Sequence, residues 1–140
     1  MKKRVLIIYT GGTIGMKKTE KGYAPVSGFL GDAISSLADM KSDGAPDWDL
    51  YEMSPLLDSS DVTVKEWNKI AAVICDNYDK YDGFVVLHGT DTMAYTASML
   101  PFSSTCAPEM VILPLVFSEP LVMFFSAGNE PVCHCSDSRC

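Results

Sequence analysis

The chain has 140 residues, of which 47% are hydrophobic and 21% are charged, and its formal net charge is −7. This composition is that of a globular domain with a hydrophobic core, and it excludes a disordered polar chain. The acidic balance argues against nucleic acid or an anionic membrane as a partner, since both are bound by clustered Lys and Arg. The apolar run Val5–Tyr9 after the basic start is too short for a signal peptide, so we expect a cytoplasmic protein.

The apolar pattern alternates between strand and helix periods along the first hundred residues. Continuous β-prone runs, typical of strands buried on both faces, occupy Val5–Tyr9 and Gly83–Leu87. The other expected elements, in chain order, are a loop or flap over residues 17–28, a short helix over 31–40, a strand over 48–53, a helix from Thr63 and a helix over 93–100. Strands and helices in this alternation indicate an α/β fold with a mainly parallel sheet.

The helix that begins at Thr63 has the clearest signals. Thr63 and Glu66 have the spacing of a capping box, in which each side chain accepts a hydrogen bond from the other residue's backbone N–H. Apolar residues then recur at the i, i+3, i+4 and i+7 positions, which are Trp67, Ile70, Ala71 and Ile74. This period predicts a helix with one buried face.

The composition changes sharply near residue 100, which predicts a boundary between residues 1–99 and a divergent part, residues 100–140. Ten of the eleven Lys and Arg residues precede this boundary, and four of the five cysteines follow it. Prolines and a glutamate interrupt the apolar stretch 110–127, which argues against a membrane span. The cysteines and histidine of residues 133–140 do not have the spacing of a common zinc site.

The first buried strand ends in the loop Thr10–Gly15, with the sequence TGGTIG. Paired glycines let backbone N–H groups approach a ligand, and Thr13 adds a hydroxyl beside them, as a nucleophile with an oxyanion-stabilising loop requires. A plain turn after the strand is equally consistent with these residues. A dinucleotide-phosphate loop is a weaker match, because the glycines do not follow the G-x-G-x-x-G spacing.

The second buried strand ends in His88–Met93, with the sequence HGTDTM. A carboxylate next to a hydroxyl at this position can hold a substrate ammonium and help to move a proton. The alternative is a helix start with Thr90 or Asp91 as its N-cap. His88 is interpreted either as a catalytic base or as a buried supporting residue. Residues 58–61, Asp-Ser-Ser-Asp, indicate either a site for a small zwitterion or an ordinary turn.

Taken together and in this order, the three polar segments resemble the L-asparaginase family. Further segments resemble its type I (cytoplasmic) bacterial branch, namely Tyr9–Met16 (YTGGTIGM), Gly22-Tyr23 with residues 25–28 (PVSG), Tyr81–Gly83 (YDG) and Met93–Ser98 (MAYTAS). The resemblance covers about residues 4–99. It implies an incomplete version of the three-layer, parallel-sheet N-terminal domain of the asparaginase fold. It also implies hydrolysis of L-asparagine to L-aspartate and ammonia, without a metal or an organic cofactor.

The resemblance also implies a role for each matched site residue. Thr13 corresponds to the nucleophile that attacks the side-chain amide and forms an acyl-enzyme, and Tyr23 to the flap tyrosine that closes over it and orients it. Thr90 corresponds to the second catalytic threonine, and Asp91 to the carboxylate that holds the substrate α-ammonium. Ser59 corresponds to the residue that binds the α-carboxylate. Backbone N–H groups near Thr13 and Thr90 are the expected oxyanion donors.

One partner of this chemistry is missing. The family places a lysine, paired with Thr90, beyond residue 140, and this chain has no lysine after Lys80. Family members are longer homo-oligomers in which a smaller second domain and a neighbouring subunit complete each site. After Ser98 the sequence also lacks the family's Thr-Gly-Ser-Gln segment, which, with the loss of lysine and gain of cysteine, suggests a reading-frame change near residues 99–101. We therefore expect this chain alone to be an impaired or inactive asparaginase.

Other functions remain open. A non-enzymatic remnant could bind asparagine weakly or associate with intact asparaginase subunits. The asparaginase-like subunit of a tRNA-dependent amidotransferase carries similar TGGT and HGTD segments, but it has an additional region before the glycine loop, which here begins at residue 10. A small nucleotide-binding domain is the third alternative.

Overall fold

The computed structural model describes residues 2–20, 22–26, 28–103, 109–111 and 122–126. Its strands are β1 (Arg4–Gly11), β2 (Met16–Thr19), β3 (Gly22–Pro25), β4 (Asp47–Leu57), β5 (Gly83–Leu87), β6 (Glu109–Val111) and β7 (Val122–Ser126). Its α-helices are α1 (Phe29–Ser36), α2 (Val64–Asn77) and α3 (Met93–Ser103). Short 3-10 helices are η1 (Thr13–Gly15), η2 (Asp39–Lys41), η3 (Ser59–Asp61) and η4 (Tyr78–Lys80).

Five of these strands form one sheet in the order β4-β1-β5-β7-β6. The first strand, β1, runs parallel to both of its neighbours, so that Ile7 lies opposite Leu50 of β4 and Val85 of β5. On the far side of β5, β7 pairs antiparallel with β5, and β6 pairs antiparallel with β7. The expected parallel sheet is therefore confirmed for the three strands β4, β1 and β5.

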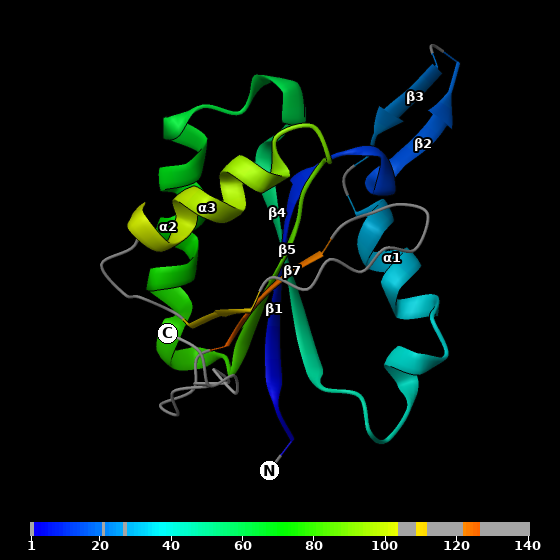
Figure 1. Ribbon diagram of the computed structural model, residues 1–140. Coiled ribbons are helices and arrows are strands. Elements are labelled where there is room, and N and C mark those ends of the chain that lie inside the picture. The colour runs from blue at the N-terminus through cyan, green and yellow to red at the C-terminus, as the bar shows by residue number, and fades with distance from the viewer. Residues whose placement is uncertain (1, 21, 27, 104–108, 112–121, 127–140) are drawn as a thin grey trace, which may run out of the picture.

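Helices cover both faces of the sheet, as Figure 1 shows, with α2 and α3 on one face and α1 on the other. Successive side chains of a strand point to opposite faces, so β1 contributes to two hydrophobic clusters. Leu6 and Ile8 pack with residues of α2 and α3, whereas Ile7 and Tyr9 pack with Leu30 of α1. The three-layer α/β arrangement expected from the sequence is confirmed.

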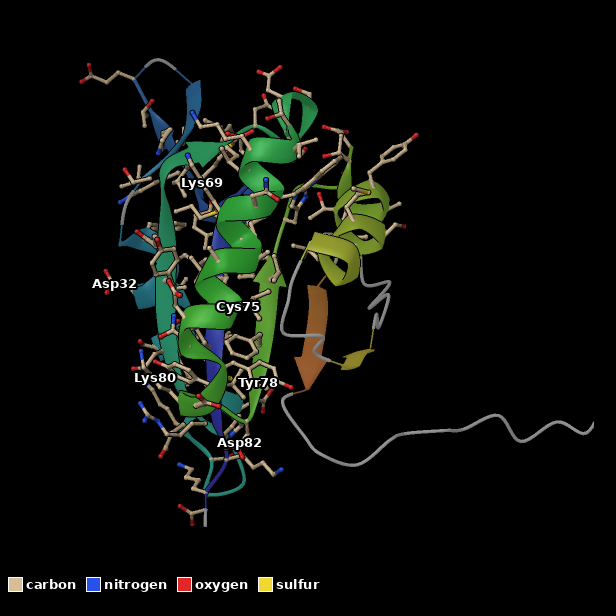
Figure 2. All side chains as sticks on the ribbon, turned by 90° about the vertical axis from the view of Figure 1, so that its left-hand side faces the viewer. Asp32, Lys69, Cys75, Tyr78, Lys80 and Asp82 are labelled. Carbon is tan, nitrogen blue, oxygen red and sulfur yellow. The ribbon has the colours of Figure 1, made fainter. Side chains whose placement is uncertain are left out.

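Helix α2 begins as its sequence predicts. The backbone N–H of Thr63 donates to Glu66 Oε2 over 3.1 Å, and the Lys65 N–H donates to Thr63 Oγ1 over 3.3 Å. Ile70 and Ile74 are buried against the sheet. Figure 2 looks onto this helix and shows its length lying along the strands, with Lys69 on the exposed side. The capping box and the buried face are both confirmed.

Some element boundaries differ from those that the sequence predicts. Residues 17–28, predicted as a loop or flap, contain the antiparallel hairpin β2–β3, in which Lys17 pairs with Ala24. The short helix predicted over 31–40 is two elements, α1 and η2, because Leu37 has an extended backbone that ends α1. These differences arise because backbone pairing and helix ends depend on contacts that a local apolar pattern does not contain.

Within the described part of the chain, no helix is both long enough and apolar enough to cross a membrane. Most of the apolar stretch 110–127 and all of the cysteines and histidine of residues 133–140 lie outside the described residues. Helix α3 extends beyond the predicted end at residue 100 and contains Pro101. The boundary at residue 99 stays a prediction.

Candidate active site

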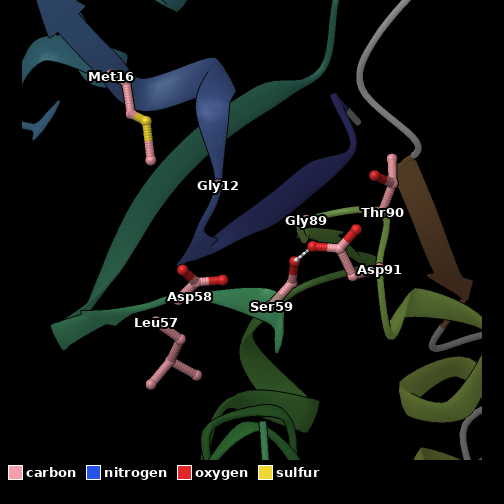
Figure 3. Close-up of a pocket in the computed structure, with 8 residues that line it drawn as sticks. All are labelled: Gly12, Met16, Leu57, Asp58, Ser59, Gly89, Thr90 and Asp91. Carbon is pink, nitrogen blue, oxygen red and sulfur yellow. Dashed lines mark hydrogen bonds between the residues drawn. The ribbon is translucent and has the colours of Figure 1, made fainter. Parts of the chain in front are cut away.

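A pocket of about 190 Å³ lies at the carboxyl edge of the parallel strands β1, β4 and β5. Its lining comes from the loops that follow these strands and from the start of the hairpin, and consists of Gly12, Met16, Leu57, Asp58, Ser59, Gly89, Thr90 and Asp91. Figure 3 shows these residues arranged around a common space, with the Leu57 side chain directed away from it. Ligands bind at this edge in open α/β sheets, because the loops after parallel strands converge there.

Two segments that are far apart in the sequence are in contact at this pocket. The hydroxyl of Ser59 donates to Asp91 Oδ2 over 3.0 Å, the bond drawn in Figure 3. Ser59 is itself held from the other side, because Thr92 Oγ1 donates to the Ser59 carbonyl over 2.6 Å. The structure therefore brings together three of the residues that the sequence indicates: Ser59, Thr90 and Asp91.

The helix that follows this loop begins later than the capping interpretation requires. The first residue of α3 is Met93, and the Thr96 N–H donates to the Thr92 carbonyl over 3.0 Å. Thr92 therefore precedes the first helical residue, and the interpretation of Thr90 or Asp91 as the N-cap is not supported by this geometry. The carboxylate of Asp91 instead faces the pocket, where a cationic group could reach it.

Two glycines in the pocket lining allow the surrounding loops to approach each other. A Cβ atom on Gly12 would lie 3.2 Å from the Gly89 backbone, and the φ of +100° at Gly12 already disfavours other residues. A Cβ atom on Gly89 would lie 2.4 Å from Ser59 Oγ. The close approach of the loops after β1, β4 and β5 thus depends on the absence of side chains at these two positions.

Asp58 both lines the pocket and stabilises the turn that presents Ser59. Its Oδ1 atom accepts hydrogen bonds from the Ser60 backbone N–H over 3.0 Å and from the Ser60 hydroxyl over 2.8 Å. These bonds lower the pKa of the Asp58 carboxyl below its ordinary value, so it stays ionised at neutral pH. The ordinary-turn interpretation of residues 58–61 therefore describes Asp58 and Ser60, while Ser59 points into the site.

His88 lies beneath the pocket in a buried series of hydrogen bonds. Its Nδ1 atom is 2.7 Å from the Gly89 carbonyl, which can only accept, so Nδ1 carries the proton. In the neutral ring Nε2 then accepts from the Thr96 hydroxyl over 3.0 Å, and the Thr96 oxygen accepts from Trp67 Nε1–H over 2.8 Å. Burial lowers the pKa of His88 and favours this neutral form.

These hydrogen bonds give His88 a supporting position. Both of its ring nitrogens have protein partners, and the residue does not line the pocket, so the catalytic-base interpretation has no geometric support here. The same bonds link α2, α3 and the loop that contains Gly89. The sequence does not indicate Thr96 as a partner of His88, or Trp67 as a donor to Thr96. The apolar period of α2 predicts only a packing role for Trp67.

Two further residues of the predicted site, Thr13 and Tyr23, lie on elements that follow Gly12. Thr13 follows Gly12 and begins η1, but its side chain lies outside the described part of the structure. Tyr23 lies on β3 with 72% of its surface exposed, and it is not part of the pocket lining. Among the described residues, no cluster of His, Cys, Asp or Glu could hold a metal ion. The catalytic roles of Thr13 and Tyr23 stay predictions.

The family model described as "Asparaginase, N-terminal" matches residues 4–114, which include every part of this pocket. The chain belongs to the asparaginase family. L-asparaginase 1 of Escherichia coli (strain K12) is 52% identical over 101 residues, which are 72% of this chain and 30% of that protein. The fold of L-asparaginase I from Vibrio cholerae O1 biovar eltor superimposes with a TM-score of 0.65 at 52% identity, over 73% of this chain and 30% of that one.

A more distant relative carries a different name. One subunit of the glutamyl-tRNA(Gln) amidotransferase from Methanosarcina barkeri is 32% identical over 112 residues, which are 79% of this chain and 26% of that protein. This asparaginase-family chain therefore spans about 30% of the length of the similar L-asparaginase from E. coli and a smaller share of the amidotransferase protein.

Proposed function

We propose that this chain carries the substrate-binding and nucleophile segments of an enzyme that hydrolyses L-asparagine to L-aspartate and ammonia. The observation that carries the proposal is the contact between Ser59 and Asp91, 3.0 Å apart in a pocket that Gly12 and Thr90 also line. A hydroxyl donor beside a carboxylate is complementary to the α-carboxylate and α-ammonium of an amino acid. The membership in the asparaginase family supports the same substrate class.

The proposed binding mode exchanges one hydrogen bond for two. A substrate ammonium replaces the Ser59 hydroxyl as the donor to Asp91, because a charged donor makes the stronger bond to a carboxylate. The hydroxyl of Ser59 then turns to donate to the substrate α-carboxylate. Asp58, which also lines the pocket, adds negative charge that favours the ammonium end of the substrate on this side.

The proposed reaction uses Thr13 as the nucleophile. Its hydroxyl oxygen attacks the side-chain amide carbon, the amide C–N bond breaks, and the nitrogen leaves as ammonia after it takes up the hydroxyl proton. Water then cleaves the acyl-threonine ester, releases aspartate and restores the hydroxyl. Thr90 lies in the pocket lining and is proposed to assist the proton transfer, and Tyr23 is proposed to orient Thr13 after the flap has moved. This scheme uses no metal or organic cofactor.

The proposed proton transfer needs a base beside the nucleophile. A threonine hydroxyl is a weak nucleophile at neutral pH until a neighbouring base removes its proton. By the family resemblance, the lysine that pairs with Thr90 corresponds to a position beyond residue 140. We therefore propose that the chain binds an amino acid but hydrolyses it poorly or not at all without further segments or subunits.

Two measurements on the purified chain test this proposal. Ammonia release from L-asparagine is compared between the unsubstituted chain and Thr13→Ala, and activity that disappears in Thr13→Ala would show that the lysine can be replaced. Binding of L-aspartate is followed by NMR for the unsubstituted chain and for Asp91→Asn and Asp82→Asn. Asp91→Asn should abolish the shifts, whereas Asp82→Asn, at the opposite end of the sheet, should retain them. Equal binding by both variants would refute the assignment of Asp91.

The amidotransferase relative supports a second candidate, in which the same pocket belongs to an asparaginase-like subunit that acts with tRNA. Co-purification with a full-length asparaginase tests the non-enzymatic alternative. Retention of a full-length asparaginase by the tagged chain would favour a non-enzymatic subunit that associates with intact copies.

We also propose that the protein is cytoplasmic. We further propose that residues 100–140 arise from a reading-frame change, which sequencing of the source gene tests.

A further inference from the structure

The hairpin β2–β3 lies between the glycine loop and α1, and its two ends lie near each other. The Val26 N–H donates to the Gly15 carbonyl over 3.3 Å, and Met16 pairs with Pro25. Figure 1 shows the hairpin projecting beyond the end of the sheet. Any motion of this hairpin must therefore pivot about the segment that contains Gly15 and the segment that contains Val26.

A tyrosine side chain of the sheet binds the first of these segments. Tyr9, on β1, is completely buried, and its hydroxyl donates to the Gly12 carbonyl over 3.0 Å. The Gly15 N–H donates to the same carbonyl over 3.4 Å, which closes the turn of η1. A Cβ atom on Gly15 would lie 2.1 Å from the Tyr9 hydroxyl oxygen. The phenol thus fits directly against the turn in which Thr13 is the first residue.

A carboxylate of the neighbouring strand binds the second segment. Glu52, on β4, accepts from the Gly28 N–H through both of its oxygens, over 3.2 and 3.1 Å. Gly28 has a φ of +78° and precedes the first residue of α1, so its N–H has no partner within the helix. A charged acceptor makes a stronger bond to a backbone N–H than a neutral one does. Glu52 therefore holds the backbone at the position where the hairpin passes into α1.

The two anchoring side chains are neighbours. Tyr9 and Glu52 lie opposite each other in the parallel pairing of β1 with β4, which places their side chains on the same face of the sheet. Burial, and to a smaller extent the negative charge of Glu52, raise the pKa of Tyr9 above its ordinary value. The phenol therefore keeps its proton and remains a donor to Gly12 throughout the neutral range.

We propose that Tyr9 and Glu52 are positioning residues that fix the two ends of the β2–β3 flap and hold the Thr13 turn at the pocket. The proposal rests on the proposed function in one respect, namely that Thr13 is the nucleophile and that the flap carries Tyr23 toward it. With both ends fixed, the flap moves as a unit about its base.

Hydrogen exchange of the full chain tests the anchors without requiring any catalytic activity. The informative amides are those of Gly15, Val26 and Gly28, whose N–H groups make the bonds described above. In Tyr9→Phe the exchange at Gly15 and Val26 should accelerate about fivefold, as expected for the loss of one hydrogen bond. In Glu52→Leu the exchange at Gly28 should accelerate at least as much.

Two further variants separate positioning from general stability. Glutamine has the same side-chain length as glutamate and keeps one oxygen acceptor. Glu52→Gln should therefore retain much of the protection at Gly28 that Glu52→Leu removes. Tyr81→Phe is the matched control for Tyr9→Phe, because it removes a tyrosine hydrogen bond of 2.9 Å, to Asp49, at the other end of the sheet. This control should leave the flap amides unchanged.

Three results would overturn the proposal. The first is the absence of protection at Gly28 in the unsubstituted chain. The second is an acceleration in Tyr9→Phe that is equally large in α2, since this would show a global loss of stability. The third is equal exchange at Gly28 in Glu52→Leu and Glu52→Gln. Because none of these readouts depends on asparagine, failure of the anchors and failure of the proposed hydrolase activity are observed separately.

Discussion

Replacing Thr96 by valine should destabilise the chain more than any change of side-chain volume explains. Thr96 is fully buried, and its hydroxyl donates to His88 Nε2 over 3.0 Å and accepts from Trp67 Nε1–H over 2.8 Å. Valine has nearly the same shape but no hydroxyl. Thr96→Val therefore leaves the packing in place and removes one partner from each of two polar groups at once.

The size of the effect follows from the burial of these two groups. A buried polar group that loses its partner costs about 1–3 kcal/mol. His88 is buried and should contribute fully, whereas Trp67 is half-buried, so that water can replace part of the lost bond. We expect Thr96→Val to lower the free energy of unfolding by about 2–4 kcal/mol in total. Thr96→Ser, which keeps the hydroxyl and loses one methyl group, should cost about 1 kcal/mol.

Urea denaturation followed by far-UV circular dichroism measures the three free energies of unfolding at pH 7.5, chosen so that His88 is neutral. The decisive quantity is the difference between the valine and the serine variants. A valine variant as stable as the serine variant would refute the inferred series of hydrogen bonds. The assignment of the proton to Nδ1 of His88 rests on the Gly89 carbonyl and does not depend on this result.

The remaining predictions concern the pH dependence, the pocket and the core. Burial keeps the pKa of His88 in the folded chain below its unfolded value of about 6.5. The contribution of neutral His88 to the free energy of unfolding is therefore complete above about pH 6.5 and falls as the pH drops toward the folded pKa. His88→Gln should lack this pH-dependent contribution when denaturation curves at about pH 5 and about pH 7.5 are compared. Gly89→Ala should displace Ser59, whose Oγ atom would lie 2.4 Å from the new methyl carbon, and lower the free energy of unfolding by about 1–3 kcal/mol in urea titrations. Thr63→Ala removes the N-cap of α2 and should cost about 1 kcal/mol by the same method. Ile74→Ala, in the core beneath α2, should cost about 2–5 kcal/mol, and a loss below 1 kcal/mol would contradict its burial.

The sequence by itself determined the elements whose signals are local. The run Val5–Tyr9 forms β1 because its β-prone apolar residues can be buried on both faces, which requires no knowledge of the partner strands. The start of α2 follows from Thr63 and Glu66, since a capping box joins residues only three positions apart. The order of the polar segments also determined the family, which the match over residues 4–114 confirms.

Only the tertiary structure decided which of these residues meet. Ser59 and Asp91 are 32 positions apart, and their contact depends on the parallel pairing of β1 with both β4 and β5. The hydrogen bonds at His88 involve Thr96 of α3, which in turn accepts from Trp67 of α2. The flap anchors come from two neighbouring strands. No local period contains either set. Tyr23 lies outside the pocket, on a hairpin that projects beyond the end of the sheet. A local pattern specifies what each segment can form, whereas packing of the whole sheet determines which side chains share a site.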